Sequence, residues 1–358
     1  MGLYQQETEE KIRLGFYPYT YVRVMTMKSK LYKKGDYDKI LKMGFAEIAK
    51  FMQESEYKKV ITEVSQQNPE SGFDMLELAL QKSLEHTLTK LRKISPEELQ
   101  VLINAYLTRY DYENVKTIIR GKFAGIPKEE IQKLLISIGL LSKEQLKKYV
   151  EMDTIEKVLQ TIPLLKKQKG KVQEALKHLK EKGSLLLIEN VLDHTYFESM
   201  VAFTTRIPLE GKLFRDFLEY EIDVLNIKTI LRLKALKLPG AKIKEHIFFS
   251  GKIFNRGQLH KFMQMDVETI IKELKKSRLK KAFSEKEQKE DMSGVELALD
   301  RFVLKTATTL LHQHPLSVDT IIGYLFAKDI EVKNLRTIIK AKQLDVPTEF
   351  IEKQLVIA

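Results

Sequence analysis

The chain of 358 residues contains no cysteine, few prolines and glycines, and no long apolar run. Without cysteine it cannot form disulfides, thiolate metal sites or a cysteine nucleophile, which suits a reducing compartment. Nine prolines and sixteen glycines leave few breaks, and alternating runs rich in Val and Thr are scarce, so helices are favoured over strands. No window approaches 18 uninterrupted apolar residues, and we therefore expect no transmembrane helix.

Motifs that would carry catalysis or nucleotide binding are also missing from the sequence. The Gly-Lys pairs lack both a glycine five residues earlier and a Ser or Thr after the lysine, so none forms a phosphate-binding loop. His312 and His314 have no neighbouring carboxylate or thiolate ligands, and we interpret them as structural. The sequence predicts no catalytic residue, no cofactor site and no metal site.

One nine-residue signature occurs three times. It reads N-V-K-T-I-I-R-G-K from Asn114, N-I-K-T-I-L-R-L-K from Asn226 and N-L-R-T-I-I-K-A-K from Asn334. The starts lie 112 and 108 residues apart (226−114 and 334−226). Each copy is preceded by an acid and followed by a proline, and its apolar residues recur at helical spacing. The repeated polar residues are Asn114, Thr117, Asn226, Thr229, Asn334 and Thr337, and we expect each Asn and Thr pair to form a polar seam between helices.

Two further landmarks recur with the signature. Q-L-K-K-Y-V-E-M-D at Gln145 matches Q-L-H-K-F-M-Q-M-D at Gln258, with a fainter version at Asp36. An E-x-x-L motif also occurs three times, at Glu77, Glu189 and Glu296. Repeats of about 110 residues are long enough to bury a core each. The sequence therefore predicts an all-α protein of three helical repeats, at residues 1–132 (with an N-terminal extension), 133–245 and 246–358.

The chain is basic, with a formal net charge of +12, which favours acidic partners. Each signature helix carries two cations four residues apart on one face, and like charges at that spacing repel. Two explanations stay open: an acidic partner, or internal ion pairs with Asp111, Asp223, Glu331 and the E-x-x-L glutamates. The six cations are Lys116, Arg120, Lys228, Arg232, Arg336 and Lys340.

The segment Y-P-Y-T-Y-V-R-V-M-T-M-K-S-K-L from Tyr17, together with the triplicated signature, resembles the C subunit of archaeal A-type and bacterial V-type ATP synthases, a family related to the d subunit of the vacuolar ATPase. The resemblance covers essentially the whole chain. One difference is Met25, where the family pattern leads us to expect a second arginine after Arg23.

The resemblance implies a funnel of three helical domains about a pseudo-threefold axis. Such a protein would be a non-catalytic rotor subunit of an ATPase or ATP synthase that translocates protons or sodium ions. It would lie peripherally on the cytoplasmic face of the cell membrane, on the proteolipid ring. It would hold the central shaft, formed by the D and F subunits, and transmit torque without binding nucleic acid or a small-molecule substrate. On this reading the six cations are candidates for the shaft interface. The alternatives are a basic helical adaptor or nucleic-acid-binding protein, and an enzyme whose site forms only in three dimensions.

Overall fold

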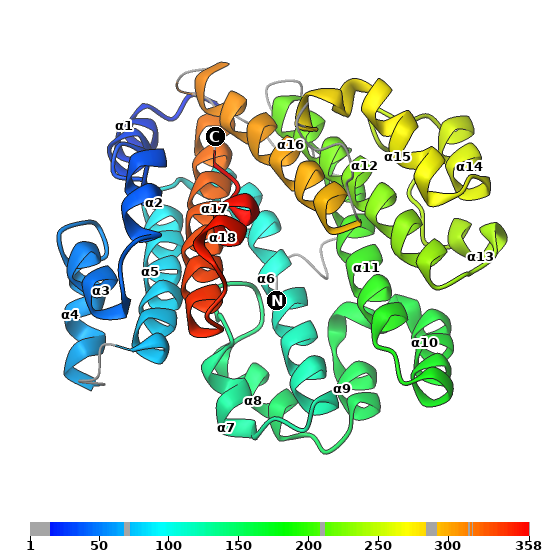
Figure 1. Ribbon diagram of the computed structural model, residues 1–358, viewed down its shortest axis with the longest axis horizontal. Helices are drawn as coiled ribbons and strands as arrows, with labels where there is room; N and C mark the ends of the chain where they lie inside the picture. Colours follow the sequence, from blue (N-terminus) through cyan, green and yellow to red (C-terminus); the bar gives the residue numbers. More distant parts are fainter. Residues whose placement is uncertain are drawn as a thin grey trace. The chain divides into compact units, whose positions relative to one another are not determined.

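The computed structural model describes residues 15–67, 72–207, 212–283, 292–313, 316 and 318–357. Within these ranges every regular element is a helix and no strand occurs (Figure 1). The predicted all-α class is therefore confirmed. The chain divides into two compact units, one formed by Glu97–Lys280 and the other by Gly15–Pro96 together with Lys281–Ala358. The three-domain division at 132/133 and 245/246 stays a prediction.

The first unit contains two long signature helices and the shorter helices that follow each of them. In chain order its elements are α6 (Glu97–Phe123), α7 (Lys128–Lys133), α8 (Lys143–Glu151), α9 (Ile155–Thr161), the 3-10 helix η1 (Pro163–Gln168), α10 (Lys169–Lys182), α11 (Leu186–Thr204), α12 (Lys212–Ala235), α13 (Gly240–Lys244), α14 (Arg256–Gln264), α15 (Val267–Lys276) and the 3-10 helix η3 (Arg278–Ala282).

The core of this unit forms around α6 and α12. Helix α6 packs against α7, α8, α9 and α11, while α12 packs against α11, α13, α14 and α15. Val115, Ile118 and Ile119, which the signature places on one helical face, are all buried. Each such side chain stabilises the fold by about 1.5–3 kcal/mol relative to exposure. The apolar spacing of the signature therefore positions both long helices.

The second unit joins the beginning of the described chain to its end. Its helices are α1 (Pro18–Lys28), α2 (Lys34–Ile40), α3 (Phe45–Gln53), α4 (Lys58–Gln67), α5 (Phe73–Lys93), α16 (Met292–Gln313), α17 (Val318–Gln343) and α18 (Thr348–Gln354).

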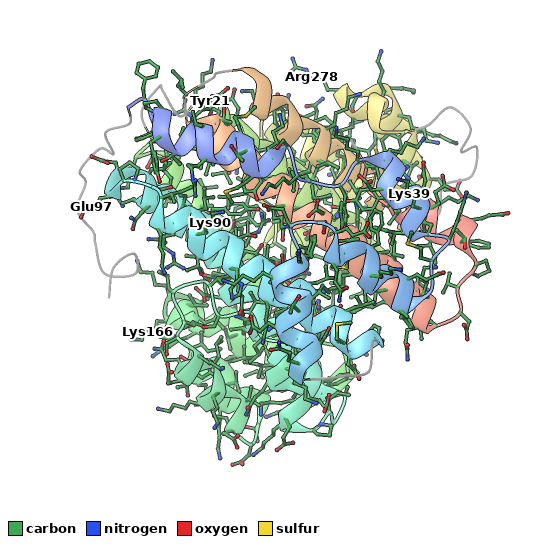
Figure 2. The ribbon with its side chains drawn as sticks, turned by 90° about the vertical axis from the view of Figure 1, so that its left-hand side faces the viewer. Tyr21, Lys39, Lys90, Glu97, Lys166 and Arg278 are labelled. Atoms are coloured by element: carbon green, nitrogen blue, oxygen red, sulfur yellow. The ribbon has the colours of Figure 1, made fainter. Side chains whose placement is uncertain are left out.

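The third signature helix, α17, is the centre of the second unit. It packs against α16, α5, α1 and α18, and Figure 1 shows α5 and α17 side by side although they are far apart in the sequence. Helix α1 crosses the C-terminal end of α5, where the Thr20 hydroxyl donates to the carbonyl oxygen of Ile94 at 2.8 Å. Figure 2 shows this region, with Tyr21 on α1 and Lys90 on α5.

Helix starts explain the repeated Gln landmark. The Ser142 hydroxyl accepts from the backbone N–H of Gln145, whose side chain accepts in turn from the N–H of Ser142. Asn255 and Gln258 form the same reciprocal pair at the start of α14. Such a capping box satisfies backbone donors that the first turn of a helix leaves free. At the start of α2, the carboxylate of Asp36 accepts from the N–H of Lys33 at 2.8 Å, so all three landmarks occupy the same position in the first turn.

Candidate functional site: the three signature helices

The asparagine of each signature binds the backbone of a residue further along the chain. In the first copy, the amide nitrogen of Asn114 donates to the carbonyl oxygen of Ile136 at 2.8 Å, and its oxygen accepts from the same residue's N–H at 2.9 Å. The partner lies 22 residues after the asparagine in every copy. The three buried pairs are Asn114 with Ile136, Asn226 with Phe248, and Asn334 with Val356. Each asparagine thus fixes the segment that follows the short helix α7, α13 or α18.

The acid that precedes each asparagine fixes a second point in the first two copies. The carboxylate of Asp111 accepts from the N–H groups of Leu140 at 2.7 Å and Leu141 at 3.1 Å. Asp223 accepts from three successive backbone N–H groups, those of Lys252, Ile253 and Phe254. Burial raises the pKa of Asp111 and of Asp223 to about 6, although the amide donors act in the opposite direction.

A glycine lies against each of these aspartates. Gly139 and Gly251 stand just before the bound segments, and a Cβ atom built at either position would overlap the carboxylate of Asp111 or Asp223. The sequence carries a signal for this role, because the two glycines are one repeat apart (251−139=112) and follow their acids at the same distance. Sequence reasoning missed it.

In the third copy the acid is Glu331, and its donors come from the beginning of the described chain. Its carboxylate accepts from the N–H of Tyr32 at 2.6 Å and from the hydroxyl of Tyr57 at 2.7 Å. The ammonium of Lys328 donates to it at 2.7 Å and lies over the Tyr57 ring, 4.2 Å from the centroid. Glu331 and Lys328 are buried. Residues 299 positions apart in the chain therefore meet here.

A lysine near the end of the signature binds the C-terminus of a neighbouring helix. The ammonium of Lys122 donates to the carbonyl oxygens of Val150, at 2.6 Å, and Met152, at the end of α8. Lys342 donates to the carbonyl oxygen of Leu41, at the end of α2, at 2.8 Å. Cations favour such free carbonyl groups at helix C-termini. On α17, the N-terminal helix α2 therefore makes the contact that α8 makes on α6.

The signature threonines contribute less than the asparagines. Thr229 is buried and Thr117 half-buried, while the Thr337 hydroxyl donates to the carbonyl oxygen of Lys333 in its own helix. We expected each Asn and Thr pair to form a polar seam between helices. Instead, the asparagines bind backbone groups of a later segment.

Four of the six signature cations make ion pairs within their own unit. Lys116 is buried and pairs with Glu113 and with Asp193 of α11. Arg120 forms two hydrogen bonds, of 2.6 and 3.0 Å, to the carboxylate of Glu189. Its side chain nevertheless stays 54 % exposed.

The third copy repeats this arrangement with α5. Arg336 pairs with Glu77 at 2.5 Å, and Lys340, 52 % exposed, lies 3.9 Å from the same carboxylate. Lys228 and Arg232 are half-buried and engaged in further interactions. Pairing with the E-x-x-L glutamates Glu189 and Glu77 is therefore confirmed, whereas Asp111 and Asp223 bind backbone amides. The structure leaves a shaft contact of the six cations untested.

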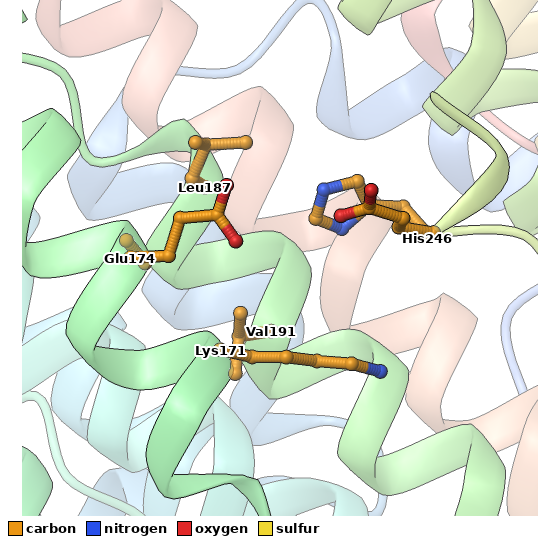
Figure 3. A pocket seen from close by; sticks show the side chains of 7 residues that line it. Lys171, Glu174, Leu187, Val191 and His246 are labelled. Atoms are coloured by element: carbon orange, nitrogen blue, oxygen red, sulfur yellow. The ribbon is translucent and has the colours of Figure 1, made fainter. Parts of the chain in front are cut away.

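A small pocket lies in the first unit between α10, α11 and the segment after α13. Its volume is about 20 Å³, and Lys171, Glu174, Leu187, Val191 and His246 line it (Figure 3). That is room for about one water molecule, far below the few hundred Å³ of a small-molecule site. The ion pair between Lys242 and Glu174, at 2.9 Å, lies beside it. We assign no ligand to this pocket.

Metal sites and membrane spans do not occur in the part of the chain that the structure describes. Its residues contain no group of three or more His, Asp or Glu side chains placed to hold a metal ion. His314 lies outside the described residues. None of the described helices combines the length and apolar character that crossing a membrane requires.

Comparison with known proteins gives the family of this chain. Residues 20–354 match the family model of the ATP synthase (C/AC39) subunit. The chain is 34% identical over 350 residues to the C subunit of the A-type ATP synthase of Methanosarcina acetivorans, covering 95% of this chain and 93% of that one. It is 32% identical to that of Methanococcoides burtonii, covering 95% and 94%, and 31% identical to that of Haloferax volcanii, covering 95% and 97%.

These matches place the chain among the non-catalytic subunits of ATP synthases. The chain belongs to the C/AC39 family of ATP synthase subunits. The resemblance seen in the sequence is therefore confirmed, and so is its assignment as a non-catalytic subunit.

Proposed function

We propose that this chain joins the central shaft, formed by the D and F subunits, to the proteolipid ring and transmits torque between them. It would act from the cytoplasmic face of the membrane as a peripheral rotor subunit. Family membership supports a role within the complex. The observation that supports the coupling role is the set of hydrogen bonds by which each signature helix holds the backbone of other segments. We call these bonds, made by the signature asparagine, the acid before it and the lysine at its end, the clamps. A part that transmits torque must resist deformation, and close packing gives protein interiors low compressibility.

These bonds hold the segments that connect the short helices. Asn114, Asp111 and Lys122 each bind backbone groups in the residues that follow α6, at separations of 22, 29 and 28 residues. The bond of Asn114 is buried and those of Asp111 and Lys122 are partly buried. Breaking the buried bond is the most costly, because each freed donor or acceptor would be left without a partner. Connecting segments between the short helices are thereby tied to the long helices.

The shaft contact is proposed for the signature cations. Arg120 and Lys340 are the best candidates because each is about half exposed while already paired. A net charge of +12 supports attraction to an acidic shaft. Lys116, Lys228, Arg232 and Arg336 are more buried, and on this proposal they orient their neighbours and add to the local positive potential.

A binding experiment tests the proposal. Purified shaft subcomplex is passed over immobilised, detergent-purified proteolipid ring with and without this protein. We expect shaft retention only when the protein is present. Equal retention in its absence, or failure of the protein to bind either partner, would refute the coupling role.

A further inference from the structure

The third signature helix holds the N-terminal helix α2 in the way that the first holds α8. The acid before each signature accepts from a backbone N–H shortly before that helix, of Leu140 in the first copy and of Tyr32 in the third. The last lysine of each signature, Lys122 or Lys342, donates to the carbonyl end of the same helix. In the first copy these partners lie 29 and 28 residues apart, but in the third they lie 299 and 301 residues apart. The N-terminal part of the chain therefore completes the third copy without following it in sequence.

Residues 30–67, which we call the strap, are the part of the chain that completes the third copy. They contain α2, α3 and α4, with α3 packed against α4. The ring of Tyr32 lies 5.7 Å from that of Phe51 and 5.7 Å from that of Tyr57, centroid to centroid. The Tyr32 hydroxyl also donates to the hydroxyl of Ser55 at 2.9 Å. Because these contacts join the start of the strap to α3 and to the start of α4, the strap can move as one piece.

Both ends of the strap continue into helices that pack against α17. Helix α1 precedes the strap and α5 follows it, and each lies against α17, while α3 and α4 pack against α5. Figure 2 shows the strap helix α2, labelled at Lys39, and α5, labelled at Lys90. The strap is thus anchored at both ends, and its own bonds to α17 are concentrated at Glu331 and Lys342.

The joint at Glu331 is ionic, unlike the joints of the acids in the first two copies. Lys328 and Glu331, three residues apart on α17, are 1 % and 3 % exposed. The Tyr57 hydroxyl of the strap donates to Glu331 at 2.7 Å, and the Lys328 ammonium donates to the same hydroxyl at 3.1 Å. The strap therefore forms part of the cover that keeps both charges from water.

A buried ion pair stabilises a closed state less than the number of its bonds suggests. Taking two charges out of water can cost as much free energy as their attraction returns, a cost that apolar packing of similar volume does not carry. Lifting the strap would return Lys328 and Glu331 to water together and still paired. The joint thus fixes where the strap binds while keeping its free energy of opening low, which is the property of a part that opens locally in a folded protein.

We propose that the strap is a lid on the third signature helix, and that it lifts from α17 as one unit while α1, α5 and α17 stay folded. When closed, it is clamped to α17 as α8 is clamped to α6. When open, it leaves the pair of Lys328 and Glu331 in water and releases Lys342 from Leu41. The segment after α6 is held by neutral amide donors and should have no such separate opening. Opening of the strap is independent of the proposed coupling role and goes beyond it.

Hydrogen exchange of the full-length protein, followed by mass spectrometry, tests this opening. Peptides from α2, α3 and α4 are compared with peptides from α5, α17 and α8. A joint variant carries Tyr57→Phe and Lys342→Met, which remove two bonds between the strap and α17 but keep the ion pair. Its matched control is Lys122→Met, which alters the lysine that holds α8 in the first copy. Circular dichroism confirms that each variant folds.

We expect α2, α3 and α4 of the unaltered protein to share one protection factor, about tenfold or more below those of α5 and α17. The joint variant should lower the protection of the strap by about tenfold or more and leave α5 and α17 unchanged. The control should leave the strap as it is.

Three results would overturn the proposal. They are equal protection of the strap, α5 and α17 in the unaltered protein, unrelated protection factors within the strap, and a loss of protection that the joint variant spreads over all helices. If the joint variant does not fold, the comparison of helices within the unaltered protein still decides.

Discussion

The first two signature helices and the third hold their neighbours by different means. On α6 and α12, a buried aspartate binds the backbone of the segment that follows, with a glycine against it. On α17, the N-terminal segment supplies the backbone donor instead. Glu331 replaces aspartate, and a buried lysine joins it. The position of Lys328 holds Thr108 and Tyr220 in the other copies.

The difference shows where the buried acid of the third signature finds its backbone donor. In the first two copies the acid and its first backbone donor are 29 residues apart. In the third copy they are 299 residues apart. The residue before the backbone donor is Leu31 in the third copy, whereas it is Gly139 or Gly251 in the other two. The third clamp therefore depends on a buried ion pair, while the first two depend on neutral amide donors.

The largest effect is expected from breaking the buried ion pair of the third copy. Lys328→Met leaves the Glu331 carboxylate buried without its cation, and removing one partner of such a pair costs about 3–5 kcal/mol. Urea denaturation of the full chain measures the loss. Adding Glu331→Gln should recover much of it. A loss below about 1 kcal/mol, the usual value for exposed pairs, would contradict the distinction drawn here.

The asparagine clamp should matter equally in all three copies. Replacing Asn114, Asn226 or Asn334 by Ala leaves a buried N–H and carbonyl without partners, which should cost about 2–4 kcal/mol in each case. Thr337→Ala is the control, because that hydroxyl bonds within its own helix. Markedly unequal losses among the three asparagine variants, measured by chemical denaturation, would show that the clamps are not equivalent.

Only the first two copies have a glycine against the buried acid, at Gly139 and Gly251. Gly139→Ala and Gly251→Ala each force a methyl group against a buried carboxylate, with an expected loss of about 1–3 kcal/mol. Gly170→Ala is the control, because its Cβ would meet no atom within 4 Å. Melting temperatures of the three variants give the comparison. Equal tolerance at Gly139 and Gly170 would remove the steric argument.

The aspartates should make stability depend on pH. Because burial raises the folded-state pKa of Asp111 and Asp223 to about 6, the folded chain binds more protons than the unfolded chain between about pH 4 and pH 6. Their contribution is fully present below about pH 4 and is lost as the pH rises through 6, by about 2–3 kcal/mol for each group, because one pKa unit corresponds to about 1.4 kcal/mol.

Denaturation at pH 4.5 and 7.5 tests this dependence. Relative to the double variant Asp111→Asn and Asp223→Asn, the unaltered protein should lose stability on going to pH 7.5. A gain over the same range would show that the amide donors outweigh burial, and that the pKa of each aspartate is lowered.

The smallest effect on stability is expected from the exposed signature cations. Arg120→Glu and Lys340→Glu should each change the unfolding free energy by less than about 1 kcal/mol, because both side chains are half exposed. Affinity for the shaft subcomplex should fall and depend less on salt. Lys157→Glu, on α9, is an exposed control. Shaft affinity that stays unchanged would leave internal pairing as the only role of these residues.

The sequence was sufficient to predict the signature helices, but it did not predict which groups their polar side chains bind. Apolar residues at helical spacing predicted that the three signatures are helical, and they lie in α6, α12 and α17. Pro127, Pro239 and Pro347, which follow the signatures, are the N-caps of the next short helices. The partners of the asparagines were not predictable, because they are backbone groups and carry no side-chain pattern. The contact of Glu331 with Tyr32 joins distant parts of the chain, which no local periodicity indicates.

Coupling itself is the most direct test of the proposed function. ATP hydrolysis and ATP-driven ion uptake are measured together in vesicles that contain the complex assembled with or without this protein. We predict that its omission abolishes ion uptake while hydrolysis by the catalytic part continues, and that adding the protein back restores uptake. Ion uptake that stays coupled to hydrolysis in its absence would contradict the account.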